Sequence, residues 1–311
     1  MTHLHRSGFV RAEGTLLVDD DGPLLPRGVG LGNWLLAEGY MWKFGDEMSS
    51  PRQIESRVSQ LVGHEEGTEF WRRFRDAFIT EADFTLIAEL GFDHVRLPIN
   101  ARGVMDASGA LLEDGFALIE RAVQWCERAG LRIVLDLHGA AGGQTGTNID
   151  DSPNGRPELF TSSTHRAHTV ALWQELAGRY RDREAVFAYD LLNEPLPNEW
   201  QHTLHDELID VYRELTSAVR EVDDRHLIMY EGSHWATNVA PLRQRYDENQ
   251  AIQFHRYWCA PDESSIGDFL ALRDALNCPI YMGEGGENTP GWVYAATRLY
   301  ERHGIGWNFW P

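Results

Sequence analysis

The chain has 311 residues, of which 42% are hydrophobic and 24% are charged, as is typical of a globular protein. Its formal net charge of −20 at pH 7 would repel nucleic-acid phosphates and anionic membrane surfaces, so we expect neither as a partner. No run approaches the roughly 18 apolar residues of a membrane span, and the N-terminus lacks an apolar signal segment. We therefore expect a cytoplasmic protein that acts on a neutral substrate.

A short β-hairpin is the first element that the sequence predicts. Residues 9–18 are rich in β-forming side chains and lead into Asp19-Asp-Asp-Gly22-Pro23, a turn sequence. No long linker or low-complexity tract divides the chain after this point. The hairpin is therefore expected to belong to the same domain as the rest of the chain.

Eight apolar, β-rich runs follow the hairpin. In chain order they span residues 28–34, 93–98, 132–138, 186–193, 226–231, 251–255, 279–283 and 304–310. Between them lie amphipathic stretches at residues 69–90, 115–129, 165–181, 201–222, 266–276 and 291–303. The connection at residues 235–247 is less regular. Apolar strands that alternate with helices form a covered parallel sheet, and eight such units close into a barrel. We therefore predict a single α/β domain over residues 1–311, with the hairpin in residues 1–26 and a (β/α)8 TIM barrel in residues 27–311.

An open, doubly wound sheet is the alternative to a barrel. It would require a glycine-rich phosphate turn after an early strand, and Gly-Val-Gly-Leu-Gly-Asn at residues 28–33 lacks the GxGxxG spacing. The chain as given ends one residue after the eighth predicted strand, so we also expect the eighth helix of the barrel to be absent.

Polar and aromatic side chains occupy the predicted carboxyl ends of the strands, where TIM barrels carry their chemistry. The residues just upstream are mostly aliphatic, and packing alone does not explain polar groups on so many strand ends. The fifth strand offers only Glu231, which matches the pattern loosely. The other members of this set are Asn33, Trp34, Arg96, His138, Asn193, Glu194, His255, Tyr257, Glu284 and Trp310.

Two glutamates of this set end apolar strands abruptly, Glu194 in an Asn-Glu-Pro motif and Glu284 in a Gly-Glu-Gly motif. A buried carboxylate is costly unless it is paired or used, and two carboxylates that face one cleft can cleave a glycosidic bond. Glu284 would be the ionised nucleophile, with Arg96 and Tyr257 as hydrogen-bond donors. Glu194 would be the acid, because an apolar setting and the charge of Glu284 would raise its pKa.

The remaining strand-end residues would bind the sugar. Asn193 can donate to the 2-hydroxyl group, His138 and His255 can bind other hydroxyls, and Trp310 would lie under the sugar ring. Each of these residues also has a structural explanation when it is taken alone. A buried histidine is more often a hydrogen-bonded core residue, and Arg96 could simply anchor a carboxylate.

The chain resembles glycoside hydrolase family 5 from residue 28 to residue 310. The resemblance implies that Glu194 is the acid/base and Glu284 the nucleophile of a retaining enzyme that needs no metal or cofactor. Retention requires the two carboxyl groups to stand roughly 5–5.5 Å apart. The resemblance rests on the positions of that family's active-site residues, which here are Arg96, His138, Asn193, Glu194, His255, Tyr257, Glu284 and Trp310.

Two further segments resemble the exo-β-glucanase and β-glucosidase branch of that family. They span residues 27–38 and 136–151. Asn33 departs from the pattern, because glycine is common at its position. The resemblance implies that Glu38 holds hydroxyls of the terminal sugar and closes the cleft into a pocket, and it adds Asn148 to the substrate-binding set. Asp150 and Asp151 would either act as Glu38 does or belong to a solvated loop.

An endo-acting β-glucanase or mannanase of the same family is the principal alternative. Trp200, Trp235, Trp258 and Trp292 follow strand ends or lie in the connections after them. They could form platforms along an open groove or wall a pocket. We favour a pocket contacted by Trp235 and Trp258, because an enzyme without an export signal meets short β-linked oligosaccharides or glycosides rather than polymers.

A metal-dependent hydrolase and a non-catalytic sugar-binding barrel are alternatives from other classes. His3-Leu-His5 has a metal-ligand spacing but precedes the hairpin, and Cys126, Cys259 and Cys278 form no CxxC pair. Both carboxylates and their supporting residues are present, so nothing favours a protein that only binds. The sugar configuration, the linkage and the oligomeric state stay open.

Overall fold

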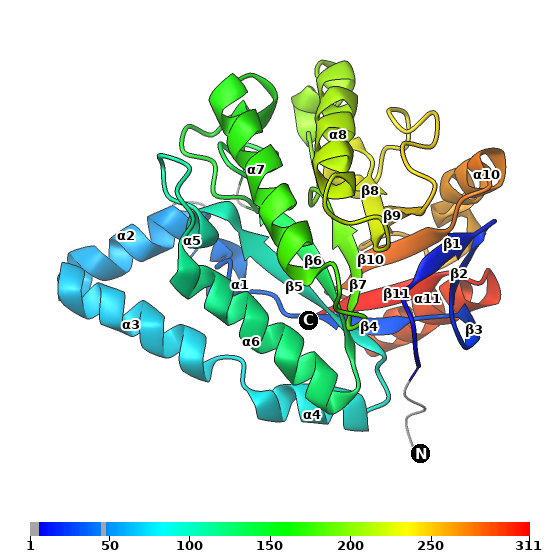
Figure 1. Ribbon diagram of the computed structural model, residues 1–311, viewed down its shortest axis with the longest axis horizontal. Coiled ribbons are helices and arrows are strands. Elements are labelled where there is room, and N and C mark those ends of the chain that lie inside the picture. The colour runs from blue at the N-terminus through cyan, green and yellow to red at the C-terminus, as the bar shows by residue number, and fades with distance from the viewer. Residues whose placement is uncertain (1–5, 45–47, 148) are drawn as a thin grey trace.

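The computed structural model describes residues 6–44, 48–147 and 149–311. Among these residues, eight parallel strands form a closed barrel in the order β10-β11-β4-β5-β6-β7-β8-β9, which confirms the predicted TIM barrel (Figure 1). The last strand pairs with the first, with Trp307 opposite Arg27 and Phe309 opposite Val29. The strands are β4 (Arg27–Gly30), β5 (His94–Asn100), β6 (Arg132–Gly139), β7 (Val186–Asp190), β8 (Leu227–Glu231), β9 (Gln250–His255), β10 (Ile280–Gly286) and β11 (Gly306–Trp310).

The predicted N-terminal hairpin is present, and a third strand extends it into a three-stranded antiparallel sheet. Its strands are β1 (Arg11–Glu13), β2 (Leu16–Asp19) and β3 (Gly22–Leu24). The third strand was not predicted, because Gly22 and Pro23 pair with Asp19 and Val18 where the sequence suggested a turn. Val10 and Leu17 pack against Leu227, at the amino end of β8. The sheet therefore covers the amino end of the barrel and leaves the carboxyl end for a site.

Helices surround the barrel. They are α1 (Gly39–Trp42), α2 (Pro51–Val62), α3 (His64–Ala77), α4 (Glu81–Glu89), α5 (Ala101–Val104), α6 (Glu113–Ala129), α7 (Ser163–Tyr180), α8 (His205–Arg220), α9 (Ser233–Ala236), α10 (Gly267–Leu276) and α11 (Pro290–Arg302). None of the helices in the described part of the chain is long and apolar enough to cross a membrane.

Helix boundaries follow local capping chemistry. The single helix predicted at residues 69–90 is two helices, α3 and α4, because the Thr80 amide donates to Asp83 at 2.7 Å and starts a new helix. Helix α2 was not predicted, although Pro51 at its first position is a typical start. As predicted, the connection after β8 is irregular. Within α9, His234 and Trp235 have left-handed φ angles of 54° and 60°.

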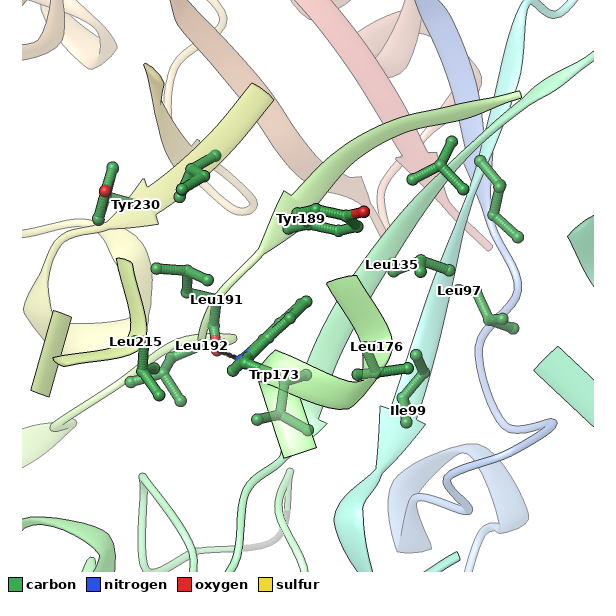
Figure 2. Close-up of a cluster of buried hydrophobic side chains, with 14 of the residues drawn as sticks. Leu97, Ile99, Leu135, Trp173, Leu176, Tyr189, Leu191, Leu192, Leu215 and Tyr230 are labelled. Atoms are coloured by element: carbon green, nitrogen blue, oxygen red, sulfur yellow. Dashed lines mark hydrogen bonds between the residues drawn. The ribbon is translucent and has the colours of Figure 1, made fainter. Parts of the chain in front are cut away.

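The main core lies between the barrel and helices α7 and α8. Figure 2 shows Leu135 of β6, Trp173 of α7 and Leu215 of α8 gathered around the segment that follows β7. The indole of Trp173 donates to the Leu191 carbonyl at 3.0 Å, and both side chains are fully buried. Each buried side chain of this size stabilises the fold by about 1.5–3 kcal/mol. This packing holds the exit of β7, three residues before Glu194.

Candidate active site

A cavity of about 760 Å³ opens at the carboxyl ends of the barrel strands. Closure of the barrel therefore brings together side chains that are far apart in the sequence. Nine of the predicted site residues line it: Glu38, His138, Glu194, Trp235, His255, Tyr257, Trp258, Glu284 and Trp310. Arg96 and Asn193 lie beneath the cavity and are fully buried.

Glu194 stands in a strained turn just after β7. Its φ angle is 47°, in the left-handed region that non-glycine residues rarely adopt. Its amide donates to the Glu231 carboxylate at 2.6 Å, which holds the turn from the side of β8. A strained backbone conformation persists only where the surrounding residues enforce it, and such conformations are common at functional sites. The turn directs the Glu194 carboxylate into the cavity, which it lines.

His255 joins the two candidate catalytic carboxylates. Its Nδ1 atom lies 2.7 Å from Glu194 Oε1 and 3.5 Å from Glu284 Oε2. One ligand atom from each of the three side chains lies within 4.8 Å of the others. One oxygen of Glu194 and one of Glu284 are thus closer together than the roughly 6.5–9.5 Å that separates the carboxyl groups of an inverting site.

Glu284 is held in its ionised form by two donors. Arg96 donates to Oε1, and the Tyr257 hydroxyl donates to Oε2 at 2.8 Å. Burial opposes ionisation, but the positive charges of His255 and Arg96 outweigh it and hold the pKa of Glu284 below its ordinary value. Among the described residues, Glu194, His255 and Glu284 form the group that could hold a metal ion. The Arg96 guanidinium already binds Oε1 of Glu284, and its positive charge would repel a cation there.

Glu194 has the opposite electrostatic setting. Burial raises its pKa to about 7, even though the hydrogen bond from His255 acts against the rise. At neutral pH the site thus contains one carboxyl that can donate a proton and one carboxylate that can act as a nucleophile. Two carboxyl groups whose pKa values are separated in this way can serve one as an acid and the other as a nucleophile.

His138, Asn193 and Trp310 are ordered by hydrogen bonds and stacking. His138 Nδ1 lies 2.7 Å from Asp136, and its Nε2 lies 3.2 Å from the Asn193 amide nitrogen. Burial lowers the pKa of His138 to about 3, so the ring is neutral and Nε2 accepts from Asn193. Trp310 stacks on His138 with an interplanar angle of 5° and a centroid distance of 5.5 Å. The ring pair presents a fixed wall to the cavity.

Glu38 is the least satisfied polar group of the cavity wall. It is 2% exposed, and its Oε1 atom has no hydrogen-bond partner among the described residues. The nearest polar atom of His138 lies 3.7 Å away. Burial and the charge of Glu284 raise the pKa of Glu38 well above its ordinary value. A buried carboxyl with an unpaired oxygen is ready to bind a ligand hydroxyl.

Several predicted residues lie elsewhere. Trp34 is not at the cavity: its indole donates to the Arg75 carbonyl at 2.8 Å and stacks on Trp125 in the core, because it lies beyond the last paired residue of β4 and turns outward. Asn33 contributes through the Glu38 loop, since its Oδ1 accepts the Glu38 amide at 3.1 Å. The structure therefore does not place Trp34 where it could contact a substrate. Asn33 holds the backbone of Glu38 in place.

The loop after β6 also differs from expectation. Asp150 is fully buried and accepts the amides of Thr145 and Ser152, at 2.7 and 2.9 Å. Asp151 pairs with Arg52 at 3.2 Å. Both aspartates therefore order the loop, and they neither line the cavity nor form a solvated surface. The predicted substrate contact at residue 148 and the histidines at positions 3 and 5 lie outside the described residues.

The tryptophans of the loops divide into two groups. Trp235 and Trp258 line the cavity, and Trp258 is 76% exposed at its rim. Trp200 and Trp292 pack against the core and are absent from the cavity wall. Sequence reasoning missed Tyr40 and Glu287, which also line the cavity. Tyr40 lies in helix α1, which was not predicted, and Glu287 directly follows β10, which extends three residues beyond the predicted strand.

Comparison with known proteins identifies the family of this chain. The family model described as cellulase (glycosyl hydrolase family 5) matches residues 54–310. The chain is 30% identical over 255 residues to a β-xylosidase of Phanerodontia chrysosporium, and the match covers 80% of this chain and 52% of that protein. It is 31% identical to cellodextrinase A of Ruminococcus flavefaciens, with 76% and 79% covered. A probable glucan 1,3-β-glucosidase A of Aspergillus fumigatus is 30% identical, with 66% and 50% covered.

Solved structures share the fold. An endogalactoceramidase superposes with a TM-score of 0.74 at 21% identity, covering 98% of this chain and 74% of that one. Thermotoga maritima Cel5A in complex with mannotriose superposes with a TM-score of 0.65 at 19% identity, covering 92% and 89%. This chain spans about half the length of several of its curated relatives, 52% of the β-xylosidase and 50% of the glucan 1,3-β-glucosidase. On the family match over most of its length, the chain belongs to glycoside hydrolase family 5.

Proposed function

We propose that this chain is a retaining β-glycosidase of the exo-acting type, with Glu284 as nucleophile and Glu194 as acid/base. One observation carries the proposal: two carboxyl groups joined by His255 share one cavity, and their environments shift their pKa values in opposite directions. Family membership supports the same chemistry, because retaining glycosidases work by this pairing.

The proposed mechanism is a double displacement. Glu284 attacks the anomeric carbon while Glu194 gives its proton to the leaving oxygen, and a covalent glycosyl-enzyme results. Glu194 is then ionised, and the His255 ring at 2.7 Å stabilises its charge. In the second step Glu194 takes a proton from the water that hydrolyses the ester, which restores both groups. Arg96 and Tyr257 keep Glu284 ionised and aimed between turnovers.

The exo-acting preference rests on Glu38. Its unpaired buried oxygen beside His138 provides a fixed contact for hydroxyls at the non-reducing end of a substrate. Trp235 and Trp258 would then flank the leaving group, since both line the same cavity. Relatives named as a β-xylosidase and a glucan 1,3-β-glucosidase support a substrate that is cut at its terminal unit. We therefore propose a β-linked oligosaccharide or glycoside as the substrate.

Hydrolysis of p-nitrophenyl β-glucoside, β-xyloside and β-mannoside, followed by proton NMR, tests this proposal. We expect release of a monosaccharide whose first detected anomer is β. An α anomer would contradict retention, and rapid viscosity loss of a soluble β-glucan without monosaccharide would favour the endo-acting alternative. Loss of all hydrolysis together with retained sugar binding would indicate a binding protein. The Glu284→Ala variant, purified in parallel, controls for contaminating activity.

A further inference from the structure

Glu231 uses both carboxylate oxygens inside the candidate site, although it does not line the cavity. It ends β8 and is fully buried. Its Oε2 atom accepts the backbone amide of Glu194 at 2.6 Å. Its Oε1 atom accepts from Gln253 and lies 3.3 Å from Arg96 Nη2 and 3.3 Å from His255 Nε2. A single side chain thus contacts the backbone of Glu194 and the histidine that contacts its carboxylate.

The arrangement Glu231–His255–Glu194 determines which ring nitrogens carry protons. His255 Nε2 faces Glu231, and Nδ1 faces Glu194 at 2.7 Å. The pKa of Glu231 is lowered, so Glu231 is an ionised acceptor and Nε2 carries a proton toward it, while Nδ1 donates to Oε1 of Glu194. Burial acts against this charge, but Glu231 and Glu284 outweigh it and raise the pKa of His255 well above its ordinary value.

The backbone contact has a separate effect. The left-handed φ of 47° at Glu194 turns its amide toward β8, where Glu231 satisfies it. An unsatisfied amide in this buried position would favour a relaxed turn, and the Glu194 carboxylate would move with it. The position of Glu231 is itself held, because its backbone amide and carbonyl both bond the Tyr212 hydroxyl of α8, at 3.2 and 2.8 Å.

We propose that Glu231 is a positioning residue for the acid/base: one oxygen holds the backbone of Glu194, and the other keeps His255 doubly protonated beside the Glu194 carboxylate. This inference rests on the proposed function, because it assigns Glu231 to the proton transfers of that reaction. Glu231 acts through its neighbours and contacts no substrate, since it lies below the cavity wall.

Other charged groups face this arrangement from every neighbouring strand. Arg96 approaches from β5, and Asp136, Asp190 and Glu284 approach from β6, β7 and β10. Burial raises the pKa values of Asp136 and Asp190 well above the ordinary value, whereas the pKa of Glu284 is lowered. Neutral His138 lies on β6. In a Glu231→Gln variant these groups stay in place, and the amide oxygen can still accept the Glu194 amide. The variant therefore changes the side-chain volume little, but it removes both the charge and the acceptor oxygen that face His255, Arg96 and Gln253.

The expected effect of Glu231→Gln follows from the loss of charge on His255. A neutral His255 ring stabilises ionised Glu194 less than a charged ring does. The repulsion between Glu231 and Glu194 also disappears, but its effect on the pKa of Glu194 is smaller than that of His255. The pKa of Glu194 therefore rises. We expect the alkaline limb of the kcat/KM profile to move up by about 0.5–1 pH unit. For phenyl β-glycosides kcat/KM should fall about 10–100-fold, whereas for 2,4-dinitrophenyl β-glycosides, which need no acid, it should fall less than about threefold.

Asp223→Asn is the matched control. Asp223 forms another buried carboxylate–histidine pair, with His226 at 2.5 Å, beside the opposite end of β8. This variant should leave the alkaline limb where it is. If the alkaline limb does not shift in Glu231→Gln, or if kcat/KM falls equally for both leaving groups, the inference is overturned. Turnover by the wild type would still support the proposed function in that case. Absence of turnover in the wild type would instead overturn the proposed function.

A measurement on the wild type covers the case in which Glu231→Gln does not fold. Nitrogen-15 NMR of the histidine rings, with His255 assigned from a His255→Asn variant, should show protons on both ring nitrogens between pH 5 and 8. A neutral His255 ring in this range would overturn the inference.

Discussion

Two buried carboxylate–histidine pairs lie beside opposite ends of β8, and they behave differently. Asp223 bonds His226 near the amino end, and Glu194 bonds His255 at the carboxyl end. Asp223 also accepts from the Tyr189 hydroxyl at 2.7 Å and from the Arg225 amide at 2.8 Å. Although burial opposes its ionisation, the His226 hydrogen bond and these other donors lower its pKa to about 2.

Glu194 has a less complete set of donors. Among the described residues, His255 is the hydrogen-bond partner of its carboxylate, and the rest of that group faces the cavity. Burial therefore dominates, and the pKa of Glu194 rises to about 7. The comparison shows that burial and a histidine do not by themselves produce an acid. The number of donors that the protein supplies decides between a structural ion and a group that can give up a proton.

The largest effect should come from Glu284→Ala, which removes the proposed nucleophile beside the Glu194–His255 pair. We expect kcat to fall on the order of 10⁴-fold or more, because no other described group can form the covalent intermediate. Steady-state hydrolysis of several aryl β-glycosides measures this loss. Comparable activity in Glu284→Ala and the wild type would refute the nucleophile assignment.

Glu194→Ala should have the next largest effect, and the effect should depend on the substrate. For leaving groups that need protonation, kcat/KM should fall about 10²–10⁴-fold. For 2,4-dinitrophenyl β-glycosides the burst of released phenol should persist, because the first step then needs no acid. Stopped-flow absorbance resolves the burst. Equal losses on both substrate types would contradict the acid/base role.

The pH profile provides an intermediate effect on the wild type. Glu194 acts protonated and its pKa is about 7, so kcat/KM should fall about tenfold per unit as the pH rises beyond that value. Glu284 acts ionised and its pKa lies below the ordinary 4.5, so the acid limb should appear below pH 4.5. Initial rates between pH 3 and 9 measure both limbs. A flat profile up to pH 9 would show that Glu194 does not titrate as described.

The smallest effect concerns the Asp223–His226 pair and appears in the free energy of unfolding. The pKa of Asp223 is depressed in the folded state, from 3.8 to about 2, so its contribution is present above pH 3.8 and is lost as the pH falls toward 2. Asp223→Asn should therefore cost about 1–2 kcal/mol at pH 7 and less at pH 3. Urea unfolding at the two pH values tests this. An equal cost at both would mean that shape, and not charge, explains the loss.

Much of this molecule could be predicted from patterns along the chain. The apolar runs identified all eight barrel strands, because strands buried on both faces are rich in aliphatic and aromatic residues. The site predictions were weaker where local geometry decides orientation. Trp34 follows β4 in a turn, and a turn can direct its indole to the core or to the cavity. Sequence spacing carries no information on that choice.

The sequence by itself determined the fold class and the two carboxylates, since a strand that ends in an isolated glutamate is conspicuous in an apolar context. Tertiary structure alone decided that their pKa values shift in opposite directions. Glu194 and Glu284 are 90 positions apart. Only closure of the barrel brings Arg96 to Glu284 and buries Glu194 beside His255. The reason is physical: a pKa depends on charges and donors within a few ångströms, and most of those come from other strands.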